Sequence, residues 1–174
     1  LRKLAVLIVF AALLFTVLPD RVAAQNNIED YYPLEIGNNW TYRLTMEATW
    51  YPKVTGEMKA EINSKQQVGD AYCYVLEYKI RETVTDQYCL AWQEGKLFLY
   101  RSVIDGKTSN PVPPMVYLDT PVSVGHKWTW NGKLVDLEGR MHEATMSQEV
   151  VERTQITVPA GTFDAYMIKV ESRV

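Results

Sequence analysis

The sequence predicts an all-β domain, either a curled antiparallel sheet or a partly open β-barrel. Several segments alternate apolar and polar side chains with a period of two, which is the pattern of half-buried strands. Short turns that contain Gly, Asn or Asp separate these segments. After residue 24 no stretch has a clear helical period, so we expect sheets to form the core.

The first 24 residues have the organisation of a secretory signal peptide. Arg2 and Lys3 form a positive start, residues 4–18 are almost entirely apolar, and residues 22–24 (Val-Ala-Ala) supply small side chains for a cleavage site. The apolar run has 15 residues, which is short of the roughly 20 that a membrane-spanning helix needs. Cleavage is therefore favoured over an uncleaved anchor, and we expect a periplasmic or secreted protein with no membrane span after cleavage.

Length and charge restrict the roles open to the mature chain, a single β domain over residues 25–174. Of 18 basic and 21 acidic residues, three basic and one acidic lie in the first 24, which leaves 15 and 20 and a net charge of −5. This sign argues against nucleic-acid binding, which needs a basic surface. A domain of this size buries about 68–70 % of its unfolded surface, so it needs no metal to fold.

A ten-residue pattern occurs twice and is expected to organise the core. Residues 33–42 (PLEIGNNWTY) and 121–130 (PVSVGHKWTW) share Pro, two aliphatic residues, Gly, Trp, Thr and a final aromatic residue. The defining residues are Pro33, Gly37 and Trp40 in the first copy and Pro121, Gly125 and Trp128 in the second. Gly suits a turn with positive φ, and Trp-Thr-aromatic alternates as a strand does. We expect each copy to be a turn that leads into a strand whose Trp plugs one end of a common core.

Strands are expected on both sides of Pro52, which interrupts a ladder because it has no N–H. Up to the second copy of the repeat, the expected strands are 40–50, 54–68, 71–80, 84–93, 96–104 and 115–119. A loop with three prolines, residues 108–114, precedes the last of them. Short turns between these strands favour a meander of sequential neighbours.

The second half of the chain is less regular. Asn131-Gly132 is a favoured pair for a tight hairpin and is expected to turn the chain into a strand at 133–137. Residues 140–154 are mostly polar with a weak alternation, and a helix over Met141–Arg153 is the alternative there. Strands at 155–158 and 163–174 follow, and because the pattern stops inside the last strand we expect one or more closing strands beyond Val174.

Three motifs resemble those of exported bacterial β-rich proteins of unknown function, described as TapB-like and related proteins. They are residues 31–42 (YYPLEIGNNWTY), 124–130 (VGHKWTW) and 157–166 (TVPAGTFDAY). The resemblance implies a curved antiparallel sheet, similar in outline to periplasmic lipoprotein-carrier half-barrels. It also implies further chain after residue 174. The motifs are specific for the group and not for a chemistry.

No residue pattern predicts catalysis, a metal or a cofactor. His126 and His142 are the two histidines, whereas a zinc site needs three or four ligands at suitable spacing. No Gly-x-Ser-x-Gly elbow, His-Glu-x-x-His motif or phosphate-binding loop is present. Asp residues lie at turns and strand ends, where Asp is a turn former. We therefore expect a protein that is not an enzyme.

Cys73 and Cys89 are expected to form a cross-strand disulfide. Their strands form a hairpin that, with its centre at Arg81, places the two cysteines opposite each other and Tyr74 opposite Tyr88. Directly opposed Cβ atoms lie about 4.5–5.5 Å apart, close to the roughly 3.5–4.5 Å of a disulfide. Export would bring the thiols into an oxidising compartment. Two free buried thiols are the alternative.

The aromatic content is high, with five Trp, eleven Tyr and four Phe. Ordinary packing is one explanation, because aromatic residues favour strands. A groove lined by rings, for an acyl chain, a sugar or a peptide, is the other. If the sheet is curled, the candidates for its concave lining are Trp40, Tyr42, Leu44, Tyr72, Tyr74, Tyr88, Leu90 and Trp92. The predicted function is binding of a hydrophobic or amphipathic molecule, and the alternative is a structural or protein-interaction module of the bacterial cell envelope.

Overall fold

The computed structural model describes residues 29, 31–48, 51–136 and 138–173. Over these ranges the chain forms antiparallel β-sheets that do not close into a barrel, without an α-helix. This confirms the predicted all-β class. No helix among the described residues is long and apolar enough to cross a membrane. The predicted signal peptide lies outside the described residues.

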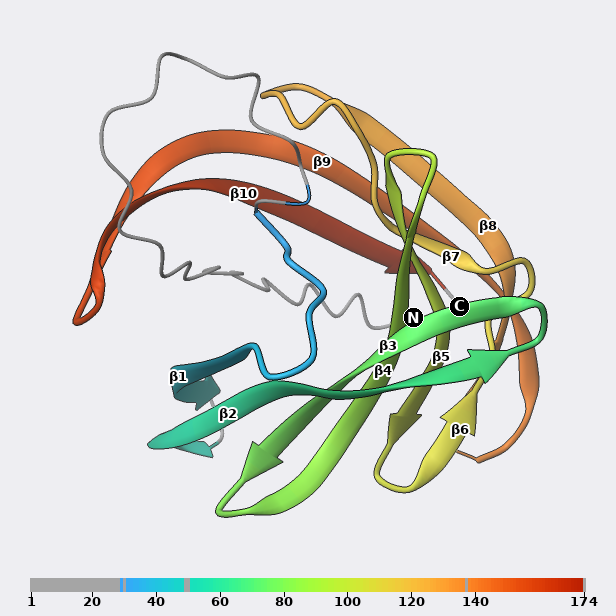
Figure 1. The fold of residues 1–174 in the computed structure, drawn as a ribbon, viewed down its shortest axis with the longest axis horizontal. Coiled ribbons are helices and arrows are strands. Elements are labelled where there is room, and N and C mark those ends of the chain that lie inside the picture. The colour runs from blue at the N-terminus through green and yellow to red at the C-terminus, as the bar shows by residue number, and fades with distance from the viewer. Residues whose placement is uncertain (1–28, 30, 49–50, 137, 174) are drawn as a thin grey trace.

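All strands except β7 pair with a neighbour in the chain. The strands are β1 (Asn39–Ala48), β2 (Tyr51–Val68), β3 (Ala71–Ile80), β4 (Thr83–Gln93), β5 (Lys96–Ile104), β6 (Lys107–Ser109), β7 (Met115–Leu118), β8 (Lys127–Val135), β9 (Met141–Val158) and β10 (Gly161–Arg173). One sheet has the order β1-β2-β3-β4-β5-β6, with β7 also on β5, and the other has the order β10-β9-β8. A bridge between Val112 and Lys133 joins the sheets. The result is an open meander in which β9 and β10 arch over the first sheet (Figure 1).

The two copies of the repeat make the same backbone contacts. Gly37 has φ +100°, and its N–H donates to the carbonyl of Ile62 at 2.8 Å. The N–H of Ile62 in turn donates to the carbonyl of Asn38 at 2.9 Å. Residues 125–126 make the equivalent bonds to Val150, at 2.8 and 2.9 Å. Each turn therefore docks on a buried residue of an 18-residue strand.

The equivalence extends far beyond the ten-residue pattern. Ile62 and Val150 are 88 residues apart, as Gly37 and Gly125 are, and each is followed by a β-bulge. Beyond each bulge a cation lies over a directly opposed Tyr ring. These pairs are Lys65 with Tyr74, at 4.2 Å, and Arg153 with Tyr166, at 5.9 Å. The unit β1-β2-β3 thus occurs a second time as β8-β9-β10.

Trp40 and Trp128 both pack against one core cluster that lies between the two sheets. Trp128 is buried and Trp40 is half-buried. Fully buried Leu90 and Leu97 belong to the same cluster. A smaller cluster contains Cys73 and its neighbours on β3 and β4. Because successive side chains of a strand point to opposite faces, this second cluster lies on the outer face of the first sheet.

Two local predictions for the second half are wrong. β8 continues through Asn131-Gly132 without a turn. A Cβ at Gly132 would lie 2.3 Å from the Trp130 ring and 2.6 Å from the carbonyl of Val112, so the Gly allows close approach of a ring and of the proline-rich loop. The turn comes later, where Asp136 accepts the N–H of Arg140 at 2.8 Å. The alternative helix over 141–153 is also wrong, since β9 covers this stretch and its even-numbered residues face the core.

Candidate functional site

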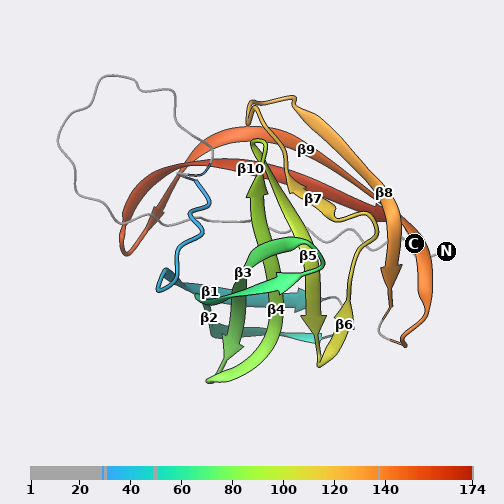
Figure 2. The ribbon, with the colours of Figure 1, turned by 45° about the vertical axis from the view of Figure 1, so that its right-hand side comes forward.

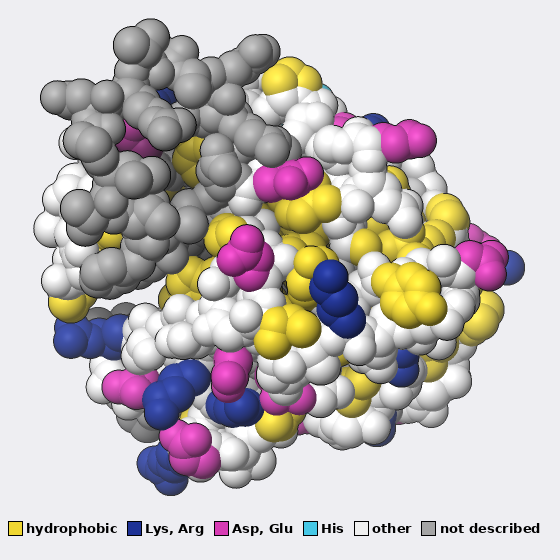
Figure 3. All heavy atoms as spheres, viewed as in Figure 1, with side chains coloured by type: hydrophobic (Ala, Val, Ile, Leu, Met, Phe, Trp, Pro, Cys, Tyr) yellow, Lys and Arg dark blue, Asp and Glu magenta, His cyan; other side chains and the backbone are white. Residues whose placement is uncertain are grey.

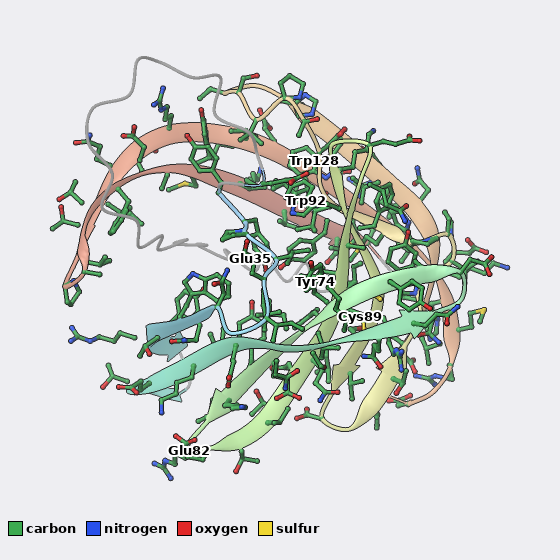
Figure 4. All side chains as sticks on the ribbon, viewed as in Figure 1. Glu35, Tyr74, Glu82, Cys89, Trp92 and Trp128 are labelled. Carbon is green, nitrogen blue, oxygen red and sulfur yellow. The ribbon has the colours of Figure 1, made fainter. Side chains whose placement is uncertain are left out.

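Aromatic side chains from five elements gather on the concave side of the meander. We define this aromatic face by side chains that belong to the core cluster or pack against it: Tyr32, Tyr42, Tyr74, Tyr78, Tyr88, Trp92 and Tyr117. Apart from the buried Tyr78, they are only partly buried. In Figure 4, Trp92 and Tyr74 lie between the arch of β9 and β10 and the strands of the first sheet. Figure 3 shows hydrophobic side chains in the middle of the same view, over β3 to β5.

The tyrosines of this face contact one another by ring edges. The rings of Tyr78 and Tyr88 lie 5.6 Å apart at 86°, and those of Tyr32 and Tyr117 lie 6.2 Å apart at 69°. Such edge-to-face pairs contribute about 0.5–1.5 kcal/mol beyond their buried area. The phenol groups of Tyr78 and Tyr117 also interact electrostatically with that of Tyr32. The face is therefore a connected set of rings with polar ends.

Burial raises the pKa values of these phenols. Loss of solvation raises the pKa of both Tyr42 and Tyr88 to about 12. Burial also raises the pKa values of Tyr32, Tyr78 and Tyr117 well above the usual value, with smaller contributions from neighbouring phenols. Phenol hydroxyls are uncharged at neutral pH even at their ordinary pKa near 10, and they both donate and accept hydrogen bonds.

The segment before the first turn runs between β10 and β1 (Figure 2). The ring of Tyr31 lies 5.6 Å from that of Tyr166 on β10. The indole Nε1 of Trp92 donates to the carbonyl of Tyr32 at 3.1 Å, and Leu34 is buried in the core. This lead-in therefore connects β10, β4 and the core from the concave side.

The residues predicted to line the concave side differ in burial and in packing. Trp40, Tyr42, Tyr74, Tyr88 and Trp92 all pack against the core cluster while partly exposed. Leu90 is 0 % exposed and is core, so its prediction as lining is wrong. Tyr72 is 71 % exposed near the β2–β3 turn and does not pack against the core cluster. The Leu44 side chain is not described. Tyr32 and Tyr117 were not predicted as lining residues, because neither lies in a long alternating segment.

The expected pairing of Cys73 with Cys89 is wrong, since both cysteines are free and buried. Cys89 lies opposite Val75. The hairpin turns through two residues with positive φ, residues 81–82, and a bulge at Thr85 moves the register further. The amide of Gln66 contacts the Cys89 sulfur at 2.8 Å. Burial, and next the neighbouring Cys89, raises the pKa of the Cys73 thiol to about 12.

The two histidines lie beside separate carboxylates, each of which also caps backbone. His142 Nε2 is 2.7 Å from Asp136 Oδ2, and backbone N–H donation by Arg140 is the main reason that the pKa of Asp136 is lowered. His126 Nε2 is 3.6 Å from Asp119, which accepts the N–H of its chain neighbour at 2.9 Å. No group of three or more His, Cys, Asp or Glu within the described ranges could hold a metal ion. Both carboxylates therefore stabilise the local backbone by accepting N–H groups.

No family model, no curated protein and no solved structure matches this chain. The resemblance of its three motifs to TapB-like proteins thus stays an expectation from the sequence. What the geometry itself defines is a class of scaffold, an open antiparallel meander with an aromatic concave face.

Proposed function

We propose that this is an exported, non-catalytic protein that binds a hydrophobic or amphipathic molecule on its aromatic face. One observation carries the proposal. Rings from the lead-in, β1, β3, β4 and β7 converge on one side of an open sheet and mostly stay partly exposed there. Small-molecule sites have linings of this kind, predominantly apolar and aromatic with a few polar groups that orient the ligand.

The chemistry of the face favours a ligand with an apolar body and an uncharged or weakly charged polar end. Its polar groups are phenol hydroxyls, which are uncharged at neutral pH, whereas the indole N–H of Trp92 already donates to the carbonyl of Tyr32. The ammonium of Lys65 lies over the outer ring, Tyr74, at 4.2 Å. The lining itself contains no cation to balance a strongly anionic ligand. An acyl chain with a hydroxyl, amide or carboxyl end fits this distribution.

The lead-in shares the aromatic face with any ligand. Tyr31 contacts β10 through the ring of Tyr166 and stays half-buried, whereas Leu34 is buried in the core. A ligand that enters beside Trp92 would therefore compete with Tyr31 and leave the first turn in place. We expect Tyr31→Ala to tighten binding about two- to fivefold, because it weakens the competing contact.

The test is titration of the exported protein with a fluorescent fatty-acid probe. We expect saturable binding that weakens at least about fivefold in Tyr88→Ala, which removes a half-buried ring of the face. Tyr72→Ala is the matched control, because this Tyr is exposed and lies off the face. A flat titration with the fold intact, or equal losses in both variants, would contradict the proposal.

The alternative, an envelope interaction module, has its own supporting observation. β1 and β10 are each paired on one side only within the described residues. Such edges present backbone N–H and C=O groups that can pair with a strand of another protein. Cross-linking in cells, followed by mass spectrometry, would favour this alternative if the links map to β1 or β10 and the probe titration is flat.

A further inference from the structure

A second concave site lies away from the aromatic face. An open depression of about 480 Å³ is lined by four segments that are far apart in the sequence. They are the β2–β3 turn (residues 68–71), Gln93 at the end of β4, Tyr100 in β5, and the proline-rich loop with Asn110, Pro111 and Pro114. This volume is within the range of about 300–1,000 Å³ that is typical of small-molecule sites.

The depression is built on a rigid floor. Val68 and Tyr100 pack against the outer cluster that contains the fully buried Cys73. Tyr100 and Gln93 both belong to the lining, and Pro111 is buried. Tyr100 is also the extra residue of a β-bulge between β4 and β5, a feature that is over-represented beside active sites. Contacts within the protein therefore hold the lining residues in place.

The lining groups select a neutral molecule that has both an apolar face and hydroxyl groups. One aromatic ring and two prolines supply apolar surface, and Asp70, Gln93 and Asn110 supply a carboxylate and two amides. No Lys, Arg or His is part of the lining, so nothing in it attracts a phosphate or a carboxylate. An alkyl chain would cover the three polar groups without giving them partners, which costs free energy.

We propose that this depression binds a neutral saccharide. A pyranose ring presents C–H groups on its face, which pack on an aromatic ring such as Tyr100. It presents hydroxyls at its edge, each a donor and an acceptor, which match an amide or a carboxylate. Asp70 and Asn110 are exposed and lie on different walls, so they can reach opposite edges of one ring. The site shares no residue with the aromatic face, and the two proposals therefore fail independently.

The test is calorimetry and amide NMR of the folded protein with neutral oligomers of glucose, galactose, mannose and N-acetylglucosamine, two to four units long. We expect saturable binding by one of them, with shifts confined to the lining segments. Asn110→Ala and Asp70→Ala, both at exposed sites, should each weaken binding about tenfold, which corresponds to 1.4 kcal/mol. Tyr100→Ala should abolish it if the variant folds, and Tyr72→Ala, an exposed Tyr outside the lining, should not change it.

Three results would overturn the proposal. The first is no binding of any oligomer at millimolar concentration by folded protein. The second is binding that Asn110→Ala and Asp70→Ala leave unchanged, since the sugar would then bind elsewhere. The third is binding of a proline-rich peptide, and of no sugar, that is lost in the same variants, which would assign the depression to a polypeptide.

Discussion

Gly132→Ala is the sharpest test of how the two sheets are joined. The new Cβ would lie 2.3 Å from Cζ2 of Trp130 and 2.6 Å from the carbonyl oxygen of Val112, where contacts below about 3.5 Å are repulsive. The Trp130 ring is 4 % exposed and its Nε1 donates to the carbonyl of Pro113 at 3.1 Å. Neither neighbour can move without loss, because Val112 also exchanges two hydrogen bonds with Lys133.

The magnitude follows from two contributions. Overpacking a core costs about 1–3 kcal/mol, and losing the indole hydrogen bond adds about 1 kcal/mol. We therefore expect the free energy of unfolding to fall by about 2–4 kcal/mol. For a domain of this size, that is a fall in Tm of roughly 4–16 °C. Urea unfolding followed by tryptophan fluorescence measures both the loss and the changed environment of Trp130.

Gly56→Ala provides the matched control. Gly56 also lies within a strand, and a Cβ there would meet nothing within 4 Å. The free energy of unfolding of Gly56→Ala should differ from that of the wild type by no more than about 0.5 kcal/mol. Trp130→Phe removes the indole atoms that clash, so the double variant should be less destabilised than the sum of the two single changes. If Gly132→Ala unfolds at the same urea concentration as Gly56→Ala, the contact between Gly132 and Trp130 is wrong.

Three further expectations concern other parts of the core. Trp128→Ala should lower the free energy of unfolding by about 3–5 kcal/mol. Trp40→Ala should lower it less, because Trp40 is only half-buried. Equal shifts of the urea midpoint in the two variants would contradict this difference in burial. Cys73 and Cys89 are free and buried, so they should not react with a thiol reagent in the native protein. After denaturation without reductant, two thiols should react. If no thiol reacts after denaturation, the cysteines form a disulfide. Burial raises the pKa of Tyr88 to about 12, so the folded state retains a proton that the unfolded state releases near pH 10. Stability should therefore fall between about pH 10 and pH 12, and this loss should be smaller in Tyr88→Phe.

The aromatic face could be predicted in part, even though the predicted hairpin register was wrong. In the β3–β4 hairpin the true register differs by two residues from the one that pairs the cysteines. A shift of two keeps every side chain on its face, because the side-chain period of a strand is two. Tyr74 and Tyr88 therefore lie on the concave side, as predicted. The predicted disulfide depends on the register itself, and it is wrong.

Other features could not be predicted because no local pattern marks them. The bulge at Thr85 changes the register without a distinctive residue. Tyr117 lies in a strand of four residues, too short to show a period. The open depression needs the β2–β3 turn, β4, β5 and the proline-rich loop to meet, which is a property of the whole meander. Asn131-Gly132 was misleading, since its Gly serves a close approach and not a turn.

The three-strand unit occurs twice, but only the ten-residue pattern at its start is recognisable as a repeat in the sequence. Gly and Trp recur at the two turns because a positive φ and a ring for the core each require a particular residue type. The cation–ring pairs recur in space, yet Lys65 and Arg153 are 88 residues apart, whereas Tyr74 and Tyr166 are 92 apart. The β9–β10 hairpin is longer by two residues in each strand, so comparison at one fixed offset misses the second half. The two rings stand at matching places on the two units, and Tyr31 contacts the second of them. A ligand on the aromatic face would thus lie between two copies of one structural unit. The lead-in would contact the second copy through Tyr31 and Tyr166.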